Sequence, residues 1–358
     1  MKYRVLVVDD SAYMRNLIAD LIGDDPELEA VGFAKEGREA VDKVKSLRPD
    51  VVALDVELPD LNHIDALERM MRECPVPVVM LGTHSHFGAS ETISALQAGA
   101  VDFIAKPVGA ALTGLSEFKK ELAGKLKAAA LVPVDKLREW VSAPFDYFPG
   151  MGNPLRLSPE DDSVVQMIAI GASAVGSRSL RELLGPLPAD FPHPIVVVQH
   201  MPSPFTAAQA LQLNKMTALR VVEARDGQSV RGGFVYIAPG ESHTKVVQSQ
   251  EGFRIALSRE PPRSGHRPSV DELFDSVSKL SLQKRHFVLL AGKGKDGAQE
   301  LANAKRSGAS STYAESMQSC AACGMPRAAI DTGAVDYILT PAEIADKLIQ
   351  LSIRQIPT

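Results

Sequence analysis

The sequence predicts an α/β protein with two doubly wound parallel-sheet domains. Short apolar runs rich in β-branched residues alternate with stretches whose apolar residues recur every three to four positions, as expected for strands alternating with helices. Polar residues directly follow several of the apolar runs. The chain has 358 residues, which is more than a single hydrophobic core usually holds, so two domains are expected.

The first half of the chain repeats strand-and-helix steps. Residues 3–8 form the first apolar run, and apolar residues at 14, 17, 18, 21 and 22 then follow at helical spacing. Further strands are predicted at 30–33, 51–54, 78–81 and 102–104, with helices at 40–47, 64–71, 93–97 and 116–131. This alternation predicts a doubly wound sheet whose chemistry lies at the carboxyl ends of its strands.

Charged residues follow three of these predicted strands. Asp9 and Asp10 come after the first strand, Asp55 after the third and Lys106 after the fifth. Clustered carboxylates repel one another unless a cation lies among them, and Mg²⁺ suits oxygen ligands and would also bind a phosphate. Asp55 is then the natural nucleophile for forming an acyl phosphate, with Lys106 as a second positive charge. The alternative is that these acidic residues only cap loops.

Three motifs in this half resemble the receiver domain of two-component response regulators, which has a flavodoxin-like fold. They are Val-Val-Asp-Asp-Ser at 7–11, Leu-Asp-Val-Glu-Leu-Pro at 54–59 and Asp-Phe-Ile-Ala-Lys-Pro at 102–107. The resemblance implies that Asp55 is phosphorylated by a histidine kinase and that Lys106 contacts the phosphoryl group.

The same resemblance implies a Mg²⁺ site formed by Asp9, Asp10, Asp55 and the Glu57 carbonyl. One departure concerns the fourth strand, which in the family usually ends in Ser or Thr. That position falls on Gly82 here, with Thr83 next to it. Either Thr83 provides the switch hydroxyl after a local shift, or this part of the switch is weakened.

A region rich in proline and glycine, without periodicity, separates the two halves. It contains Phe-Pro-Gly at 148–150 and Gly-Asn-Pro at 152–154. Frequent proline and glycine without periodicity is typical of a linker. We therefore expect a first domain over 1–120, a linker over 121–163 and a second domain over 164–358.

The second half places three reactive groups after predicted strands. Ser173 follows the strand at 165–170, His200 follows the strand at 195–198, and Asp296 follows the strand at 286–290. A serine needs a base to become a nucleophile, and a carboxylate can orient that base. The alternatives are a helix N-cap for Ser173, a core or loop role for His200 and a turn role for Asp296.

Several blocks of this half resemble the chemotaxis protein-glutamate methylesterase (CheB) family, whose catalytic domain is Rossmann-like. The blocks are Ile-Gly-Ala-Ser at 170–173, Gln-His-Met-Pro at 199–202, Gly-His-Arg-Pro-Ser-Val-Asp at 265–271 and Gly-Met-Pro-Arg at 324–327. The resemblance implies that Ser173, His200 and Asp296 form a triad. It also implies hydrolysis of glutamate methyl esters and deamidation of glutamine on chemoreceptors, with activation by phosphorylation.

The family resemblance is incomplete around the expected active site. Thr-Gly-Gly after the serine is replaced by Ala174, Val175 and Gly176, and a β-branched residue such as Val175 disfavours a positive φ. Lys293 replaces a methionine whose backbone N–H serves the family's oxyanion hole. The implied oxyanion donors are thus the N–H groups of Ala174 and Lys293. The alternative function is a catalytically weakened adaptor or phosphate sink.

The remaining features of the sequence limit which partners and which cellular location we expect. A formal net charge of -5 gives no electrostatic reason to expect nucleic acid or an anionic membrane. The sequence lacks both a signal peptide and an apolar run of roughly 18 residues, so we expect a cytoplasmic protein without membrane insertion. The chain has 3 cysteines, and we expect the Cys320-Ala-Ala-Cys323 pair to be buried or loop thiols rather than a redox or metal site. No cofactor is implied for the second domain.

Overall fold

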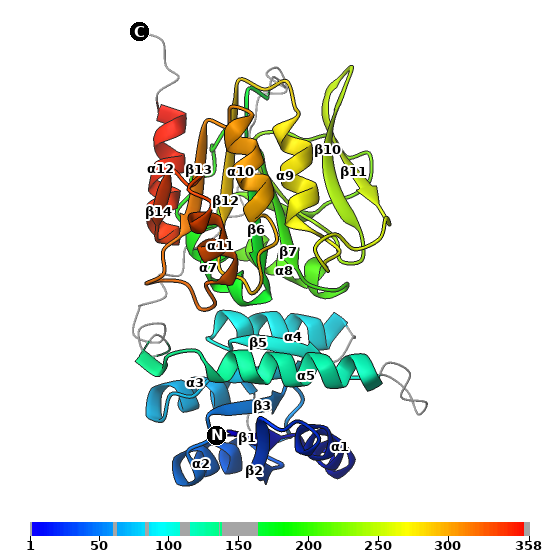
Figure 1. Cartoon of the computed structure of the whole chain (residues 1–358), viewed down its shortest axis with the longest axis vertical. Helices are drawn as coiled ribbons and strands as arrows, with labels where there is room; N and C mark the ends of the chain where they lie inside the picture. The colour runs from blue at the N-terminus through cyan, green and yellow to red at the C-terminus, as the bar shows by residue number, and fades with distance from the viewer. Residues whose placement is uncertain are drawn as a thin grey trace. The chain divides into compact units, whose positions relative to one another are not determined.

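The computed structural model describes residues 2–59, 63–82, 86–107, 115–135, 137 and 164–353. It divides into two compact units, unit 1 over Met1–Phe145 and unit 2 over Asp146–Thr358. Each unit has one parallel sheet with helices packed against it (Figure 1). The predicted fold class is therefore confirmed. The predicted boundary at residue 120 falls inside a helix of unit 1.

Unit 1 alternates strand and helix along its whole described length. Its elements are β1 (Tyr3–Val8), α1 (Ala12–Gly23), β2 (Leu28–Ala34), α2 (Gly37–Leu47), β3 (Val51–Asp55), α3 (His63–Glu73), β4 (Val78–Gly82), α4 (His86–Gln97), β5 (Asp102–Ala105) and α5 (Leu115–Ala130). The strand order is β2-β1-β3-β4-β5, with every pair parallel. The chain therefore reverses direction across the sheet between β1 and β3, and ligands bind at such points in open α/β sheets.

The central strands of unit 1 are buried on both faces. Every residue of β3 and of β4 is buried, which explains why their sequences are continuous apolar runs rather than alternating ones. Ser11 begins α1 as its N-cap, its hydroxyl accepting a hydrogen bond from the Met14 N–H at 3.4 Å. This cap fixes the turn that carries Asp9 and Asp10 out of β1.

Unit 2 contains a larger parallel sheet and a separate hairpin. Its elements are β6 (Gln166–Ser173), the short 3₁₀ helix η1 (Ala174–Gly176), α7 (Ser177–Leu184), β7 (Ile195–His200), α8 (Phe205–Met216), β8 (Arg220–Glu223), β9 (Phe234–Ile237), β10 (His243–Ser249), β11 (Gly252–Ser258), α9 (Val270–Ser278), β12 (Lys284–Leu289), α10 (Ala298–Arg306), β13 (Ser311–Glu315), α11 (Gly324–Asp331), β14 (Tyr337–Leu339) and α12 (Pro341–Ile353). The sheet order is β14-β13-β12-β6-β7-β9-β8, all parallel, while β10 and β11 pair antiparallel.

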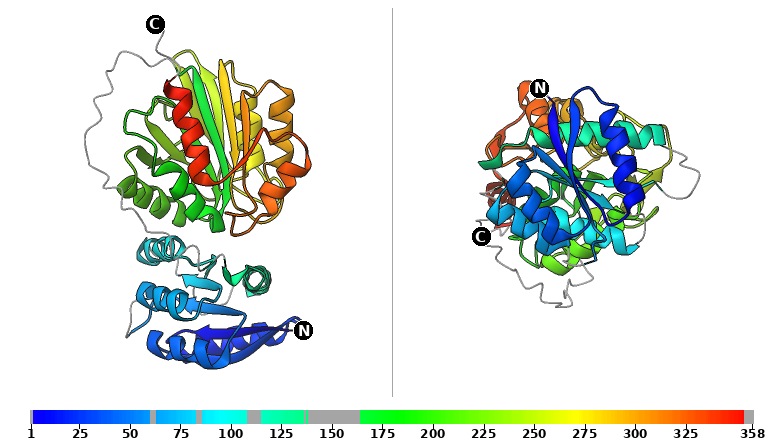
Figure 2. Two further views of the ribbon diagram at one scale, coloured as in Figure 1. Left: turned by 90° about the vertical axis from the view of Figure 1, so that its left-hand side faces the viewer. Right: turned by 90° about the horizontal axis from the view of Figure 1, so that it is seen from below.

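Two hydrophobic cores lie on opposite faces of this sheet. Met167 and Ala169 of β6 pack with residues of α9, α10, α11 and the hairpin, whereas Ile168 and Ile170 pack with residues of α7, α8 and α12. This alternation follows from the two-residue period of a strand. Figure 2 shows α12 lying across the strands on its face. Because helices cover both faces of the sheet, a reactive site is expected at the carboxyl ends of its strands.

The structure corrects the expectation for the cysteines. Cys320 and Cys323 are joined by a disulfide, and their Cα atoms are 5.5 Å apart. Sequence reasoning favoured free thiols because an odd number of cysteines does not suggest a disulfide framework. The bond depends instead on the turn between β13 and α11, which brings the two side chains together. Within the part of the chain that the structure describes, no helix could cross a membrane.

Candidate functional site

Three carboxylates gather at the carboxyl ends of β1 and β3 in unit 1. Asp9, Asp10 and Asp55 each present an oxygen within 4.8 Å of the others. Asp9 and Asp55 are buried, whereas Asp10 is exposed. The reversal of strand order explains this convergence, because β1 and β3 are neighbours in the sheet although 42 residues lie between them.

Lys106 lies against this acidic cluster. Its Nζ is 2.6 Å from Asp55 Oδ2 and 2.8 Å from Asp9 Oδ2. Burial raises the pKa of Asp55 to about 6, with Asp9 adding to the rise and Lys106 opposing it. Burial would lower the pKa of Lys106, but the attraction of Asp55 and Asp9 holds it above its ordinary value. The ammonium group therefore stays charged and pairs with the two buried carboxylates.

The acidic cluster suits a hard divalent cation. Three carboxylates meet one ammonium group, so negative charge remains uncompensated in a largely buried site. Oxygen ligands are those that Mg²⁺ prefers. The Glu57 N–H donates to Asp55 Oδ1 at 3.2 Å, which orients that carboxylate. Thr83 lies outside the described residues, and Gly82 pairs with Ala105 at the ends of β4 and β5.

In unit 2, Ser173 and His200 face each other across neighbouring strands. They are the last residues of β6 and β7, and the parallel register pairs them directly. Neighbouring strands lie about 4.8 Å apart, so the two side chains leave the sheet edge side by side. Ser173 is 8% exposed, and among the described residues its hydroxyl has no hydrogen-bond partner. The hydroxyl is thus largely buried at the same sheet edge as His200, and within the described residues no hydrogen bond joins the two side chains.

His200 is held by Asp296. The distance from His200 Nε2 to Asp296 Oδ2 is 2.8 Å. Burial opposes ionisation of Asp296, but its hydrogen bonds, that from His200 first, keep its pKa below the ordinary value. An ionised carboxylate accepts hydrogen bonds only, so Nε2 carries the proton. Nδ1 of His200 is then the ring nitrogen with a free lone pair.

The beginning of α9 fixes Asp296. Its Oδ2 accepts the Val270 N–H at 2.7 Å, and its Oδ1 accepts the Ser269 hydroxyl at 2.9 Å and the Asp271 N–H at 3.0 Å. The helix N-terminus also favours a negative charge. Sequence reasoning recognised the block at 265–271 by resemblance but missed this role.

The turn after Ser173 does not have the backbone that Val175 was expected to disfavour. Val175 lies within η1 and is absent from the described residues with positive φ, so its β-branched side chain causes no strain. The opposing turn instead relies on Gly292. A Cβ there would lie 2.0 Å from Met325 Sδ and 3.3 Å from Ser173 Cβ. Gly292 therefore allows the 291–296 turn to approach Ser173 closely.

Glu315 is a buried acid that sequence reasoning missed. It ends β13, is 1% exposed, and accepts hydrogen bonds from the Ala291 N–H at 2.8 Å and the Ser179 hydroxyl at 3.0 Å. Burial raises the pKa of Glu315 to about 7. It thus connects the turn at Ala291 to α7, the helix after Ser173. The strand that it ends has the sequence Ser-Thr-Tyr-Ala-Glu, whose weak apolar pattern gave no clear signal for it.

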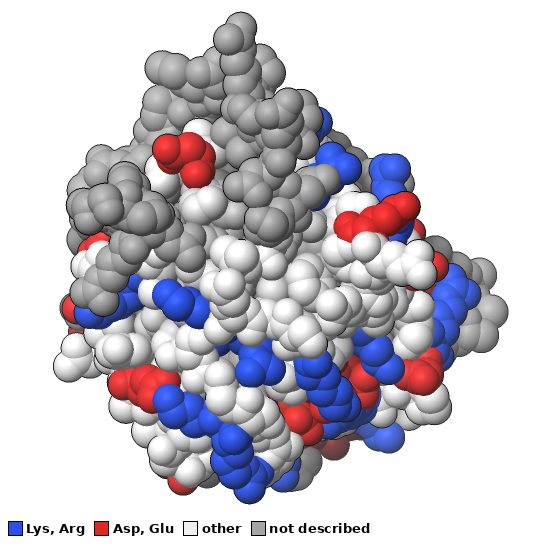
Figure 3. Space-filling model, turned by 90° about the horizontal axis from the view of Figure 1, so that it is seen from above, with Lys and Arg blue, Asp and Glu red and all other residues white. Residues whose placement is uncertain are grey.

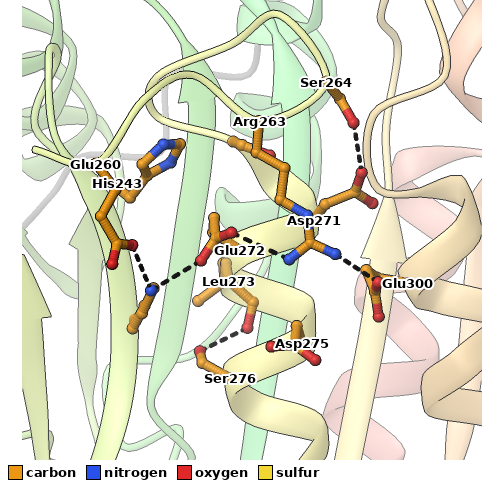
Figure 4. A network of polar contacts seen from close by, with 12 residues as sticks. His243, Glu260, Arg263, Ser264, Asp271, Glu272, Leu273, Asp275, Ser276 and Glu300 are labelled. Atoms are coloured by element: carbon orange, nitrogen blue, oxygen red, sulfur yellow. Dashed lines mark hydrogen bonds and ion pairs between the residues drawn. The ribbon is translucent and has the colours of Figure 1, made fainter. Parts of the chain in front are cut away.

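A network of ion pairs braces α9 from outside (Figure 4). Arg263 contacts Glu272 at 3.1 Å and Glu300 at 2.6 Å, which connects α9 to α10. Lys245 of β10 lies 3.0 Å from Glu272. The loop before α9, the hairpin and α10 are therefore held together around the helix that anchors Asp296.

Asp271 connects this network to the turn that carries Asp296. One of its carboxylate oxygens accepts the Ser264 hydroxyl at 2.8 Å, as Figure 4 shows, and the other accepts the Gly297 N–H at 2.9 Å. Burial raises the pKa of Asp271. Gly297 has a φ of 86°, a left-handed value that glycine adopts readily. Asp271 and Gly297 together fix the direction of the chain after Asp296.

His266 stacks on His200. Their ring centroids are 3.8 Å apart and the planes differ by 4°. Burial, together with the nearby His200, lowers the pKa of His266 to about 4, so this ring is neutral around pH 7. A neutral flat ring restricts rotation of the His200 imidazole without adding charge to the site.

Charged side chains are mixed on the face of the molecule shown in Figure 3. Lys and Arg are interspersed with Asp and Glu and with uncharged residues, and the described residues form no broad area of either charge in this view. The mixture agrees with the modest formal net charge of -5.

Known proteins resemble both units of the chain. Residues 168–348 match the CheB methylesterase family, and residues 5–113 match the response regulator receiver domain. A protein-glutamate methylesterase/protein-glutamine glutaminase of Geobacillus kaustophilus is 42% identical over 348 residues, which cover 97% of this chain and 98% of that protein. The protein of the same name from Bacillus subtilis is 38% identical over 345 residues, covering 96% of each chain.

A solved structure agrees with these matches. The catalytic domain of the Thermotoga maritima CheB methylesterase is 38% identical in sequence, with a TM-score of 0.51. The match covers 53% of this chain and 100% of that domain. The chain therefore belongs to the CheB methylesterase family, with a receiver domain preceding the methylesterase domain.

Proposed function

We propose that the chain is a phosphorylation-activated protein-glutamate methylesterase, and also a glutamine deamidase, that acts on chemoreceptors. The observation that carries the proposal is the register pairing of Ser173 with His200, together with the 2.8 Å contact from His200 to Asp296. Nucleophile, base and orienting carboxylate are the three parts of a serine hydrolase. Family membership supports the choice of a glutamate side-chain ester as substrate.

Catalysis begins with proton transfer from Ser173 to Nδ1 of His200. Asp296 accepts from Nε2, so it fixes the tautomer that leaves Nδ1 basic and stabilises the imidazolium that forms. The Ser173 oxygen attacks the ester carbonyl, and the N–H groups of Ala174 and Lys293 stabilise the oxyanion. Methanol leaves with the proton from His200, or ammonia when the substrate is glutamine. Water then hydrolyses the acyl-enzyme by the same base.

Asp55 is the proposed phosphoacceptor that controls this activity. Its carboxylate would hold Mg²⁺ together with Asp9, Asp10 and the Glu57 carbonyl. When bound, the ion neutralises charge on the incoming phosphoryl group. Lys106 pairs with the phosphorylated side chain, and Thr83 is the proposed switch hydroxyl. A histidine kinase as phosphodonor and a cytoplasmic location remain predictions from the sequence.

The direct test is methanol release from methylated chemoreceptor by the full chain. We expect Ser173→Ala to reduce the rate about 10⁶-fold, because the nucleophile is removed while the fold remains. A small-molecule phosphodonor should raise the wild-type rate and leave Asp55→Asn unchanged. A wild-type rate no higher than that of Ser173→Ala, with phosphodonor present, would contradict the proposal and favour a phosphate-dependent adaptor.

A further inference from the structure

The disulfide at Cys320–Cys323 lies directly against the turn that carries part of the candidate active site. Ala322, between the two cysteines, accepts the Gly292 N–H at 2.7 Å through its carbonyl, and the Met325 N–H donates back to the Gly292 carbonyl at 2.9 Å. Gly292 in turn borders Ser173 and precedes Lys293. The conformation of the Cys320–Cys323 segment therefore fixes the position of the 291–296 turn.

The two sulfurs differ in their accessibility. Cys320 is fully buried, whereas Cys323 is partly exposed and is the N-cap residue of α11. A thiolate at a helix N-terminus within a Cys-x-x-Cys sequence is stabilised and reactive. Exposure thus makes Cys323 the sulfur that an external thiol can reach, and in the reduced state the helix N-terminus makes Cys323 the more reactive thiolate.

We propose that Cys320 and Cys323 form a reversible dithiol–disulfide site, and that its redox state sets how firmly the 291–296 turn is held beside Ser173. In reducing compartments, disulfides are usually transient and serve catalysis or redox sensing. The consequence for catalysis rests on the proposed function, but the redox site and its effect on the turn do not.

The reactant is a dithiol reductant. One of its thiolates attacks the Cys323 sulfur, the bond to Cys320 breaks, and Cys320 leaves as a thiolate that takes up a proton. The second thiol of the reductant then attacks the mixed disulfide and releases Cys323. Two electrons and two protons pass to the protein, and the reductant becomes a disulfide.

Reduction should loosen the turn without unfolding unit 2. The Cys320 N–H still bonds to the Ser316 carbonyl at 3.1 Å, and the hydrogen bonds of Gly292 to Ala322 and Met325 are backbone bonds that do not involve the disulfide sulfurs. Losing the bridge frees Ala322 to move, so the Gly292 amide exchanges its hydrogen faster. We expect methanol release to fall about fivefold, the factor that corresponds to one ordinary hydrogen bond.

The test equilibrates the full chain in mixtures of reduced and oxidised dithiothreitol. Acid quenching and alkylation should show residues 320 and 323 gaining two alkyl groups together, reversibly, while the free Cys74 is alkylated throughout. Hydrogen exchange at Gly292 should accelerate over the same range of potentials. Cys74→Ser is the matched control and should change neither midpoint nor exchange.

Two results would overturn the inference. One is that Cys320 and Cys323 form no disulfide, or do not form it again after reduction. The other is that they oxidise and reduce reversibly while the rate of hydrogen exchange at the Gly292 amide stays the same. A Cys320→Ser/Cys323→Ser chain should show the faster exchange at every potential. If exchange responds to redox but no methanol is released in either state, the proposed function fails while the redox site stands.

Discussion

Asp55 ends a strand of one parallel sheet and Asp296 follows a strand of the other, yet their pKa values move in opposite directions. Burial raises the pKa of Asp55 to about 6, because Lys106 only partly offsets the loss of water and the repulsion from Asp9. Asp296 is equally buried, but its pKa is lowered by hydrogen bonds from His200, Val270 and the neighbouring N–H groups.

This difference shows how one kind of sheet edge supports two kinds of chemistry. At the edge of unit 1, negative charge exceeds positive charge, so the site favours an incoming cation and the phosphoryl group it accompanies. At the edge of unit 2, the carboxylate is satisfied within the chain and acts on its histidine instead.

The largest effect is expected for Asp296→Asn. An amide at this position donates to Nε2, so the proton moves to Nδ1 and His200 can no longer accept from Ser173. We expect kcat for methanol release to fall about 10⁴-fold. Phosphorylation of Asp55 is the internal control and should proceed at the wild-type rate. A fall of less than tenfold would show that Asp296 does not set the tautomer.

Glu315 should make the stability of unit 2 depend on pH. Its folded pKa of about 7 exceeds the ordinary 4.5, so the folded state binds the proton more tightly. The free energy of unfolding should therefore fall by up to about 3 kcal/mol as pH rises from about 4.5 to about 7. Glu315→Gln should remove this slope in denaturant titrations, and the exposed Asp190→Asn should retain it. An unchanged slope in Glu315→Gln would contradict the prediction.

Asp55 should also make the free energy of unfolding of unit 1 fall as pH rises, but over a lower pH range than Glu315. Its pKa is raised from 3.8 to about 6, a net value that already includes the opposing effect of Lys106. The free energy of unfolding should therefore fall by up to about 3 kcal/mol as pH rises between those values. Hydrogen exchange of β3 amides measures this for unit 1 alone. Asp55→Asn should flatten the profile, whereas the exposed Asp20→Asn should not. For Asp296, whose pKa is lowered, stability is instead lost as pH falls through that pKa.

The smallest effect is expected for His266→Ala. Removing the ring stacked at 3.8 Å lets the His200 imidazole rotate. An aromatic pair contributes about 1 kcal/mol, which corresponds to a fall in kcat of about fivefold. His266→Phe keeps a flat ring and should recover most of the rate. Because the pKa of His266 is about 4, neither variant should alter the pH–rate profile above about pH 5. A new ionisation in that range would assign His266 a proton-transfer role.

Much of the fold was predictable because its signals are local. The apolar runs of β1, β3, β4, β6 and β7 mark strands wherever both faces are covered, and reactive residues directly after them reach a common edge. The hairpin of β10 and β11 and the strands β8, β9, β13 and β14 were not predicted. Several of them are short or partly exposed, so their apolar pattern is weak.

The two parallel sheets could be predicted from local sequence, as could Asp55, Ser173 and His200 at strand ends and Asp296 in the turn after a strand, because strand period and strand termination are properties of neighbouring residues. The groups that those residues contact depend on tertiary packing. The anchoring of Asp296 by α9, the burial of Glu315 against Ala291 and the closure of the Cys320–Cys323 bridge beside Gly292 depend on segments brought together by sheet order and packing. Such contacts leave no periodic trace in the chain, since they join residues whose separation along the sequence is set by the fold.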